Sequence, residues 1–254
     1  MKIRPLPPII ATMNFLRKLW AIYGILVFFL LWLVLFPLYY ICFLVFPRPW
    51  VRYIIWFSHH IYTRLYFGLT LVRFQIEGLE KLDLKQPYII VSNHLTALDF
   101  MINARAYPSV YKFLAKKELV KVPVFGFIVR KLCVLVDRSS ASSRSSSMKY
   151  LHRTLEEGYS VFIYPEGTRN RSNEPLLPFH KGAFRIAIES QKPIAIQTLI
   201  GVKKISGQAH GLDLWPGKVL IRWSEPIETA GLTMSDVDAL SERVRAVILK
   251  NLSK

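Results

Sequence analysis

Short apolar runs alternate with stretches of helical periodicity from about residue 70 onward. The runs are rich in Val, Ile, Tyr and Phe, the composition typical of buried strands. We predict strands at Leu71–Ile76, Tyr88–Val91, Tyr111–Leu114, Cys133–Val136, Val161–Tyr164, Ile194–Ile200 and Val219–Trp223. Helices are expected near residues 96–106, 118–131, 144–157, 181–190 and 234–252. Strands that alternate with helices predict an α/β domain with a mixed, largely parallel sheet flanked by helices.

A different pattern occupies the start of the chain. Leu19 to Pro47 is an uncharged run of 29 residues, and about 20 apolar helical residues span the hydrocarbon core of a bilayer. Pro37 interrupts the run and would kink the helix or turn it into a hairpin. Four basic residues precede the run and four follow it as far as Arg73, so charge does not set its orientation. The run predicts a helical membrane anchor, either spanning or re-entrant.

Residues 50–73 show helical amphipathicity. Arg52, His59 and Tyr66 fall along one line of the helix, and Phe57 and Leu65 fall opposite. This is the pattern of a helix lying in a membrane surface, with a helix packed on the soluble domain as the alternative.

Charge marks a boundary after this helix. The first 76 residues hold eight basic and no acidic side chains, and the first acidic residue is Glu77. We therefore predict two parts: membrane-associated helices at residues 1–73 and an α/β catalytic domain at residues 74–254.

The composition of the whole chain indicates contact with a membrane or with an anionic partner. Of 254 residues, 52% are hydrophobic, and the formal net charge is +17. Such a balance suits an anionic membrane surface or anionic substrates. The chain has no arginine-rich tail or nucleic-acid-binding motif, so we expect no nucleic-acid partner. Cys42 and Cys133 lie in apolar runs, which indicates small core residues rather than a disulfide or a metal site.

Polar residues directly after the run Tyr88–Val91 are the first candidates for chemistry. His94 leaves the predicted strand at a polar corner, and Asp99 lies in the first turns of the next predicted helix. On one regular helix the two side chains would point roughly 140° apart, so they pair only if His94 precedes the helix. Asp99 would then orient the imidazole, and His94 would act as a general base. The alternative is a capping aspartate and an ordinary loop histidine.

A second polar segment, Tyr164-Pro165-Glu166-Gly167-Thr168-Arg169, follows the apolar run Val161–Ile163. Gly167 lets the backbone approach another group closely, and Arg169 can form two parallel bonds to a phosphate. The segment could hold an anionic substrate. The alternative is a structural turn with an exposed ion pair.

The two segments are expected to meet. Active sites of α/β sheets lie beyond the carboxyl ends of the strands, and both His94 and Glu166 follow strands directly. Lys116 and Arg138 also follow predicted strands and would add positive charge for a phosphate at the same edge.

Together, the His94-x4-Asp99 spacing and the later Pro-Glu-Gly-Thr-Arg segment resemble the glycerolipid acyltransferase family, of the lysophosphatidic-acid-acyltransferase type. The resemblance covers residues 70–225 and includes Val136-Asp137-Arg138 between the two motifs. The chain departs from the family pattern at Tyr164, where phenylalanine is commoner, and at Asn170, where serine is commoner.

The resemblance implies an O-acyltransferase that moves a fatty acyl group from a thioester to the free hydroxyl of 1-acylglycerol 3-phosphate, forming phosphatidic acid. The donor would be acyl-CoA or acyl-carrier protein. The acceptor is a lysophospholipid in contact with membrane phospholipids, and the catalytic domain would lie on the cytoplasmic face. No metal or bound cofactor is expected. The site would comprise catalytic His94 and Asp99, with substrate-binding Lys116, Arg138, Glu166, Gly167, Thr168 and Arg169.

Two other functions remain open from the sequence. One is a related acyltransferase that uses glycerol 3-phosphate, another lysophospholipid or an aminolipid as acceptor. The other is a membrane lipid-binding protein that keeps the fold without catalysis. The chain has no Gly-x-Ser-x-Gly motif, so direct attack by the acceptor hydroxyl is favoured over an acyl-enzyme.

Overall fold

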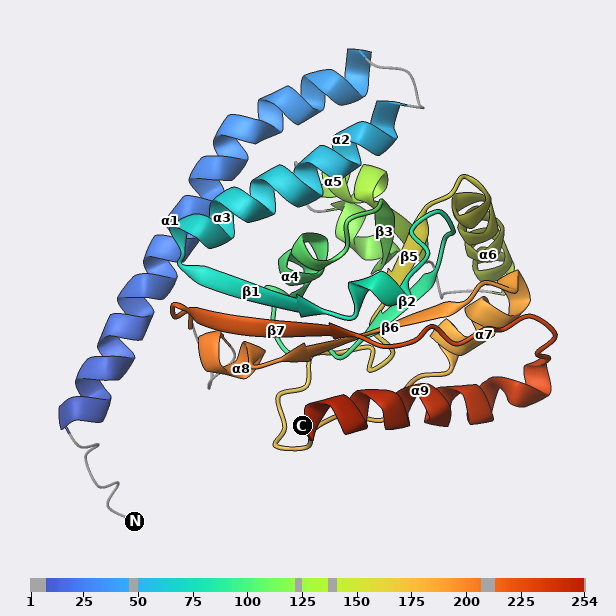
Figure 1. Cartoon of the computed structure of the whole chain (residues 1–254). Helices are drawn as coiled ribbons and strands as arrows, with labels where there is room; N and C mark the ends of the chain where they lie inside the picture. The colour runs from blue at the N-terminus through green and yellow to red at the C-terminus, as the bar shows by residue number, and fades with distance from the viewer. Residues whose placement is uncertain (1–7, 46–49, 122–124, 137–140, 207–212, 254) are drawn as a thin grey trace. The chain divides into compact units, whose positions relative to one another are not determined.

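A computed structural model describes residues 8–45, 50–121, 125–136, 141–206 and 213–253 (Figure 1). The chain forms two compact units. The first contains the residues up to Gln75, together with Leu95–Arg105 and Gly201–Leu220. The second contains Ile76–His94, Ala106–Ile200 and Ile221–Lys254. The division between residues 73 and 74 expected from the sequence stays a prediction.

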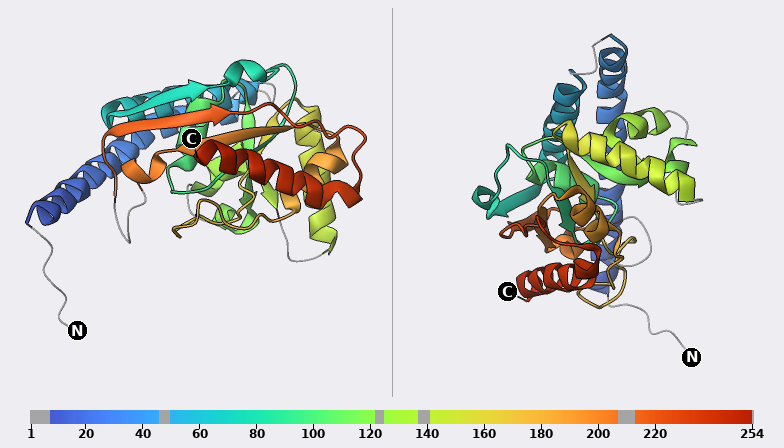
Figure 2. Two further views of the ribbon diagram at one scale, coloured as in Figure 1. Left: turned by 60° about the horizontal axis from the view of Figure 1, so that its bottom comes forward. Right: turned by 90° about the vertical axis from the view of Figure 1, so that its right-hand side faces the viewer.

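The first unit is built on a long helix, α1 (Pro8–Val45), which continues past Pro37. It runs alongside a second helical segment, made of α2 (Val51–Phe57), a π-helical stretch (Ser58–Tyr62) and α3 (Thr63–Leu69) (Figures 1 and 2). The chain therefore reverses direction after α1 ends, and not at the proline.

Aromatic side chains fasten the two helical segments together. The hydroxyl of Tyr62 donates to the carbonyl oxygen of Phe28 at 2.8 Å, and the Trp20 indole donates to the carbonyl of Thr70 at 3.3 Å. The Phe28 ring meets the ring of Tyr66 edge-on, with centroids 6.2 Å apart. Near the start of α1, Arg17 forms a largely buried ion pair with Asp213 at 2.7 Å.

Much of the apolar surface of α1 stays exposed within its unit. Leu30, Leu33 and Val34 are each more than 60% exposed. Within the described residues, Met13–Cys42 is long and apolar enough to cross a membrane, as judged by length and composition. An outward apolar surface of this size marks an interaction site for lipid or protein.

The second helical segment turns its polar line inward. His59, Thr63 and Tyr66 are buried, whereas Phe57 and Leu65 are exposed. The predicted amphipathic pattern is therefore present from His59 onward, with these polar side chains packed inside the unit and these apolar side chains outside. Arg52, on the same predicted line, is exposed.

A seven-stranded sheet follows, with the order β1-β7-β6-β2-β5-β3-β4. The four pairings from β6 to the edge strand β4, which are β6 with β2, β2 with β5, β5 with β3 and β3 with β4, are parallel. An antiparallel bridge joins Ile194 to Ile227. The predicted mixed, largely parallel sheet is confirmed. The strands are β1 (Val72–Glu77), β2 (Ile89–Ser92), β3 (Tyr111–Lys116), β4 (Cys133–Val136), β5 (Ser160–Ile163), β6 (Ile194–Ile200) and β7 (Gly217–Trp223).

Three helices of the second unit pack on one face of its strands: α6 (Ala141–Glu156), α7 (Gly182–Ser190) and α9 (Val237–Leu252). The helices contact every second residue of a strand, because successive side chains of a strand point to opposite faces of the sheet. Val91, Ile163 and Ile196 point into this core, so the intervening residues point to the other face.

Several helix boundaries differ from the expectation. The helix predicted at 118–131 is a 3-10 turn (Lys117–Lys121) and α5 (Phe125–Leu132). The helix predicted at 144–157 is α6 (Ala141–Glu156), which begins three residues earlier, within a serine-rich block. The helix predicted from residue 96 is α4 (Asp99–Ala106), which begins three residues later.

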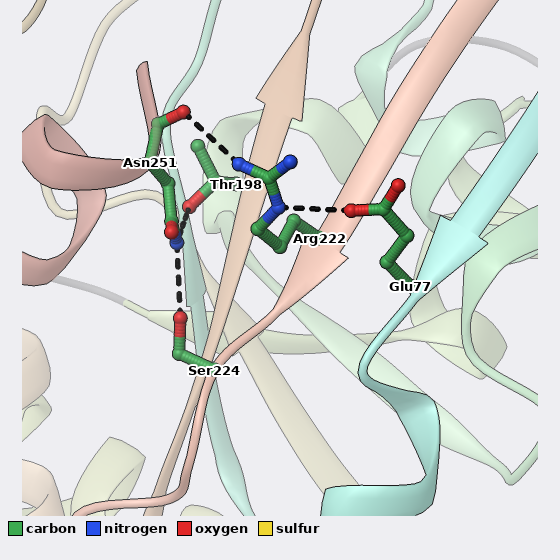
Figure 3. A network of polar contacts seen from close by, with 5 residues as sticks. All are labelled: Glu77, Thr198, Arg222, Ser224 and Asn251. Atoms are coloured by element: carbon green, nitrogen blue, oxygen red, sulfur yellow. Dashed lines mark hydrogen bonds and ion pairs between the residues drawn. The ribbon is translucent and has the colours of Figure 1, made fainter. Parts of the chain in front are cut away.

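A polar network joins the end of α9 to the sheet (Figure 3). The Asn251 amide donates to the hydroxyls of Thr198 at 3.0 Å and Ser224 at 2.9 Å. Arg222 donates to the backbone carbonyl of Asn251 and to the Glu77 carboxylate at 3.0 Å. These contacts fix the C-terminal helix against β6 and β7.

Candidate functional site

The candidate site begins where β2 ends. Asn93 is fully buried, and its side chain forms two hydrogen bonds with the backbone of Leu199 in β6. The Leu199 N–H donates to Oδ1 of Asn93 at 2.8 Å, and Nδ2 of Asn93 donates to the Leu199 carbonyl at 3.0 Å. This pair of hydrogen bonds resembles the pairing of two strands, and it fixes the residue that directly precedes His94.

The segment after β5 holds the backbone of His94 on both sides. The N–H of His94 donates to Oε1 of Glu166 at 2.7 Å, and its carbonyl accepts from the N–H of Asn170 at 2.7 Å. The structure thus brings together the two polar segments that sequence reasoning expected to meet.

The His94 ring lies on an aromatic surface. It stacks on the ring of Tyr164, with centroids 4.0 Å apart and planes inclined by 13°. Tyr164 in turn lies near parallel to Phe113 of β3. A stack of this kind limits rotation of the imidazole.

Glu166 is 2% exposed, and its described contacts use both carboxylate oxygens. Oε2 accepts from the N–H of Leu177 at 2.8 Å, while Oε1 accepts from His94. Backbone N–H groups stabilise the charged form of a buried carboxylate. Glu166 therefore links three stretches of backbone, and its predicted contact with substrate stays a prediction.

Gly167 stands where no other residue fits well. Its φ is +68°, in the left-handed region that favours glycine. A Cβ atom at this position would lie 2.6 Å from Cδ2 of His180, whose N–H donates to the Pro165 carbonyl at 2.8 Å. The turn is therefore closed by His180.

Asp99 belongs to the first unit and begins α4. Its carboxylate accepts from the N–H groups of Leu95 and Thr96 and from the Thr96 hydroxyl at 3.0 Å. These are capping contacts that fix the corner after His94. The pairing of Asp99 with the His94 imidazole stays a prediction.

The cationic candidates come at or after the carboxyl ends of strands in the sequence. Lys116 ends β3 and is in register with Val136 at the end of β4, so the two strand ends lie side by side. Arg138, two residues further on, lies outside the described residues. Thr168 and Arg169 are exposed in the turn after β5. Their predicted roles toward a phosphate stay predictions.

Several residues that shape the site were not singled out as functional by sequence reasoning. Asn170 and Leu177 act through their backbone N–H groups, which leave no signature of residue type. Asn93 acts through its side-chain amide, which bonds to the backbone of Leu199. Asn170 carried a weak signal as a departure from the family pattern.

Cysteine chemistry is disfavoured at Cys133. Burial raises the pKa of the Cys133 thiol to about 12, so the nucleophilic thiolate is scarce near neutral pH. Within the described part of the chain, no group of three or more His, Cys, Asp or Glu side chains is arranged to hold a metal ion.

Comparison with known proteins identifies the family. A family model described as "Acyltransferase" matches residues 73–199, which includes both polar segments. The chain is 31% identical over 180 residues to 1-acyl-sn-glycerol-3-phosphate acyltransferase alpha of Mus musculus, covering 70% of this chain and 63% of that protein. It is 35% identical over 179 residues to the beta enzyme of Homo sapiens, covering 70% and 63%. This chain thus spans slightly less than two thirds of these relatives.

A third relative and a solved structure agree. An uncharacterized acyltransferase of Schizosaccharomyces pombe is 33% identical over 197 residues, covering 72% of this chain and 68% of that protein. The crystal structure of the 1-acyl-sn-glycerophosphate acyltransferase PlsC from Thermotoga maritima shares the fold, with a TM-score of 0.75 and 21% identity over 93% of this chain and 97% of that one. On these matches, and on the meeting of its two motif segments, the chain belongs to the PlsC-like acyltransferase family.

Proposed function

We propose that the protein transfers a fatty acyl group from a thioester donor to the free hydroxyl of 1-acylglycerol 3-phosphate, forming phosphatidic acid. The observation that carries the proposal is the pair of backbone hydrogen bonds by which Glu166 and Asn170 hold His94. Family membership supports acyl transfer, and the names of the relatives support this acceptor.

His94 is assigned the role of general base. Histidine titrates near neutral pH, so its neutral ring can take the proton of the acceptor hydroxyl as that oxygen attacks the thioester carbonyl. The C–S bond breaks as the new ester bond forms, and the thiol leaves with the proton. Asp99 is assigned the role of orienting the imidazole. This assignment follows from the His-x4-Asp spacing.

The phosphate of the acceptor is assigned to the cations at the sheet edge. Arg169 is exposed in the turn that contains Gly167, and its planar guanidinium can bind two phosphate oxygens at once. Lys116 and Arg138 follow neighbouring strands and would add charge, and Thr168 would add a hydroxyl. An acyl-CoA or acyl-carrier protein would supply the thioester.

We propose further that α1 and the α2–α3 segment attach the protein to the cytoplasmic face of a membrane. The exposed leucines of α1 would enter the lipid, and the positive net charge would attract anionic headgroups. A membrane-bound site suits an acceptor that is itself a membrane lipid.

The test is product analysis with purified protein and a panel of acceptors. One acyl-CoA would be offered with 1-acylglycerol 3-phosphate, glycerol 3-phosphate, a lysophosphatidylcholine and an aminolipid, and the products identified by mass spectrometry. The proposal predicts phosphatidic acid as the main product. A different main product would contradict the acceptor assignment. Absence of acyl transfer with either acyl-CoA or acyl-carrier protein would favour the lipid-binding alternative.

Arg169→Lys is the matched variant for the phosphate assignment. It keeps the charge and loses the bidentate geometry, so the KM for 1-acylglycerol 3-phosphate should rise by roughly 10-fold. The KM for the acyl donor should stay unchanged. An equal rise in the KM of both substrates would contradict an acceptor-specific role.

A further inference from the structure

Asn170 forms more hydrogen bonds around the candidate site than a simple turn residue requires. It is 1% exposed, and its side chain makes three hydrogen bonds within the turn formed by residues 170–174. Nδ2 donates to the Glu174 carbonyl at 2.8 Å. Oδ1 accepts from the N–H of Ser172 at 3.0 Å and from its hydroxyl at 2.7 Å. Both the nitrogen and the oxygen of the amide therefore hold its own loop.

This loop has one described hydrogen bond to the histidine. The N–H of Asn170 donates to the carbonyl of His94 at 2.7 Å, opposite the bond from the His94 N–H to Glu166. A residue held at both backbone groups keeps the direction of its side chain. The stack on Tyr164 then sets the plane of the ring.

We propose that Asn170 is a positioning residue for His94. Its side chain fixes the 170–174 turn, the turn aims its N–H at the His94 carbonyl, and that bond holds the imidazole in the orientation in which it takes a proton. The proposal rests on the proposed function only in assigning the proton transfer to His94. In the sequence, Asn170 is only a departure from the serine that is common in the family.

A purely local role for Asn170 makes a different prediction. If its side chain only stabilises the loop, its loss lowers the unfolding temperature and leaves the folded enzyme as active as before. If it positions His94, the folded enzyme loses turnover, because small misplacements of a catalytic group cost up to about 100-fold in rate.

The experiment compares Asn170→Ala and Asn170→Ser with Asn251→Ala in the full-length protein. Asn251 is the matched control, since it is also buried and its amide makes two hydrogen bonds in a network of the same unit (Figure 3). Steady-state kinetics are measured well below each unfolding temperature. For Asn170→Ala, kcat should fall by roughly 10- to 100-fold while both KM values change by less than about 3-fold.

Asn170→Ser should restore part of the lost turnover. A serine hydroxyl can still accept from the Ser172 N–H, although it cannot reproduce the bond to Glu174. Asn251→Ala should lower the unfolding temperature and leave kcat unchanged. A kcat for Asn170→Ala within about 2-fold of wild type, or a rise in KM alone, would overturn the proposal.

A second measurement observes the histidine directly. Protein labelled with ¹³C in its six histidine rings gives ring-proton signals, and His94→Gln identifies the signal of His94. The stack on Tyr164 should shift that signal upfield in the wild type. Asn170→Ala should reduce the shift, and Asn251→Ala should not.

The two measurements separate the proposals. A His94 signal that moves in Asn170→Ala, in a protein without acyl transfer, would contradict the proposed function and support the positioning role. A signal that stays unchanged would overturn the positioning role even if acyl transfer depends on His94.

Discussion

The candidate site is assembled largely from backbone contacts. His94 is held through its N–H and carbonyl, and Glu166 uses both oxygens on N–H groups. Charged hydrogen bonds to buried backbone contribute about 1.5–3 kcal/mol each, which is enough to keep a loop in one conformation. The side chains that remain exposed in this region, such as Arg169, are the ones available to a substrate.

The first prediction concerns Gly167 and the effect of adding one methyl group there. Gly167→Ala should lower kcat/KM by roughly 10-fold or more, because its φ is positive and its Cβ would overlap His180. The measurement is steady-state acyl transfer at saturating donor.

Gly182→Ala is the control for that variant. Nothing lies within 4 Å of a Cβ at Gly182, and the residue begins α7. It should keep wild-type kinetics. Equal kinetics for both variants would contradict the role of the Gly167 turn.

A second prediction is that the Cys133 thiol takes no part in acyl transfer. Burial raises its pKa to about 12, so its thiolate fraction should be very small at pH 8 and rise only as the pH approaches that value. Iodoacetamide at pH 8 should leave Cys133 unmodified by peptide mass spectrometry, and Cys133→Ala should retain acyl transfer. Rapid alkylation coupled to loss of activity would contradict this.

At the scale of elements, the strands and their polar ends could be predicted from sequence. The apolar run Tyr88–Val91 corresponds to β2, which begins and ends one residue later. The run Val161–Tyr164 corresponds to β5, which begins and ends one residue earlier. Buried strands leave a strong signal because every side chain is apolar. The meeting of His94 with Glu166 followed from the parallel arrangement, and the structure confirms it.

Other features could not be predicted because they depend on tertiary contacts. The serine-rich block that begins at Ala141 has weak helix propensity, yet it forms the start of α6. The burial of polar residues such as Thr63 depends on packing inside the unit, where Tyr62 of the same segment bonds to Phe28 of α1. The contact of Asn170 with His94 uses a backbone N–H that every residue except proline carries.

The network around Asn251 predicts how α9 is held. Asn251→Ala should lower the free energy of unfolding by about 1–3 kcal/mol, because the buried hydroxyl of Thr198 loses its donor. Ser253→Ala, which removes one exposed hydrogen bond near the end of the same helix, should change it by less than about 0.5 kcal/mol. Urea denaturation measures both. Equal losses would show that the network does not anchor the helix.

At the scale of the whole molecule, charge and apolar surface act together. The net charge of +17 and the exposed leucines of α1 predict binding to vesicles that contain anionic lipid. Binding should exceed that to neutral vesicles and should weaken as salt rises from 0.05 to about 0.5 M, because salt screens surface charge. Vesicle co-sedimentation measures this. Equal binding to neutral vesicles at all salt concentrations would contradict an electrostatic contribution.

Leu33→Glu separates the apolar contribution from charge. Leu33 is 63% exposed on α1, and a buried charge in lipid is costly, so binding should fall by roughly 10-fold or more. Met234→Glu makes the same change in charge at a residue of the second unit that is 47% exposed, and it should bind like the wild type. Similar losses for both variants would indicate a charge effect and not insertion of α1.

The most direct test of the account is acyl transfer by wild type and His94→Ala. Thiol released from an acyl-CoA and phosphatidic acid formed from 1-acylglycerol 3-phosphate are measured in the same reaction, with the unfolding temperatures matched. We predict equal amounts of both products in the wild type and a fall in kcat of roughly 100- to 10,000-fold in His94→Ala. Wild-type turnover by a folded His94→Ala protein would contradict the assignment of His94 as the general base.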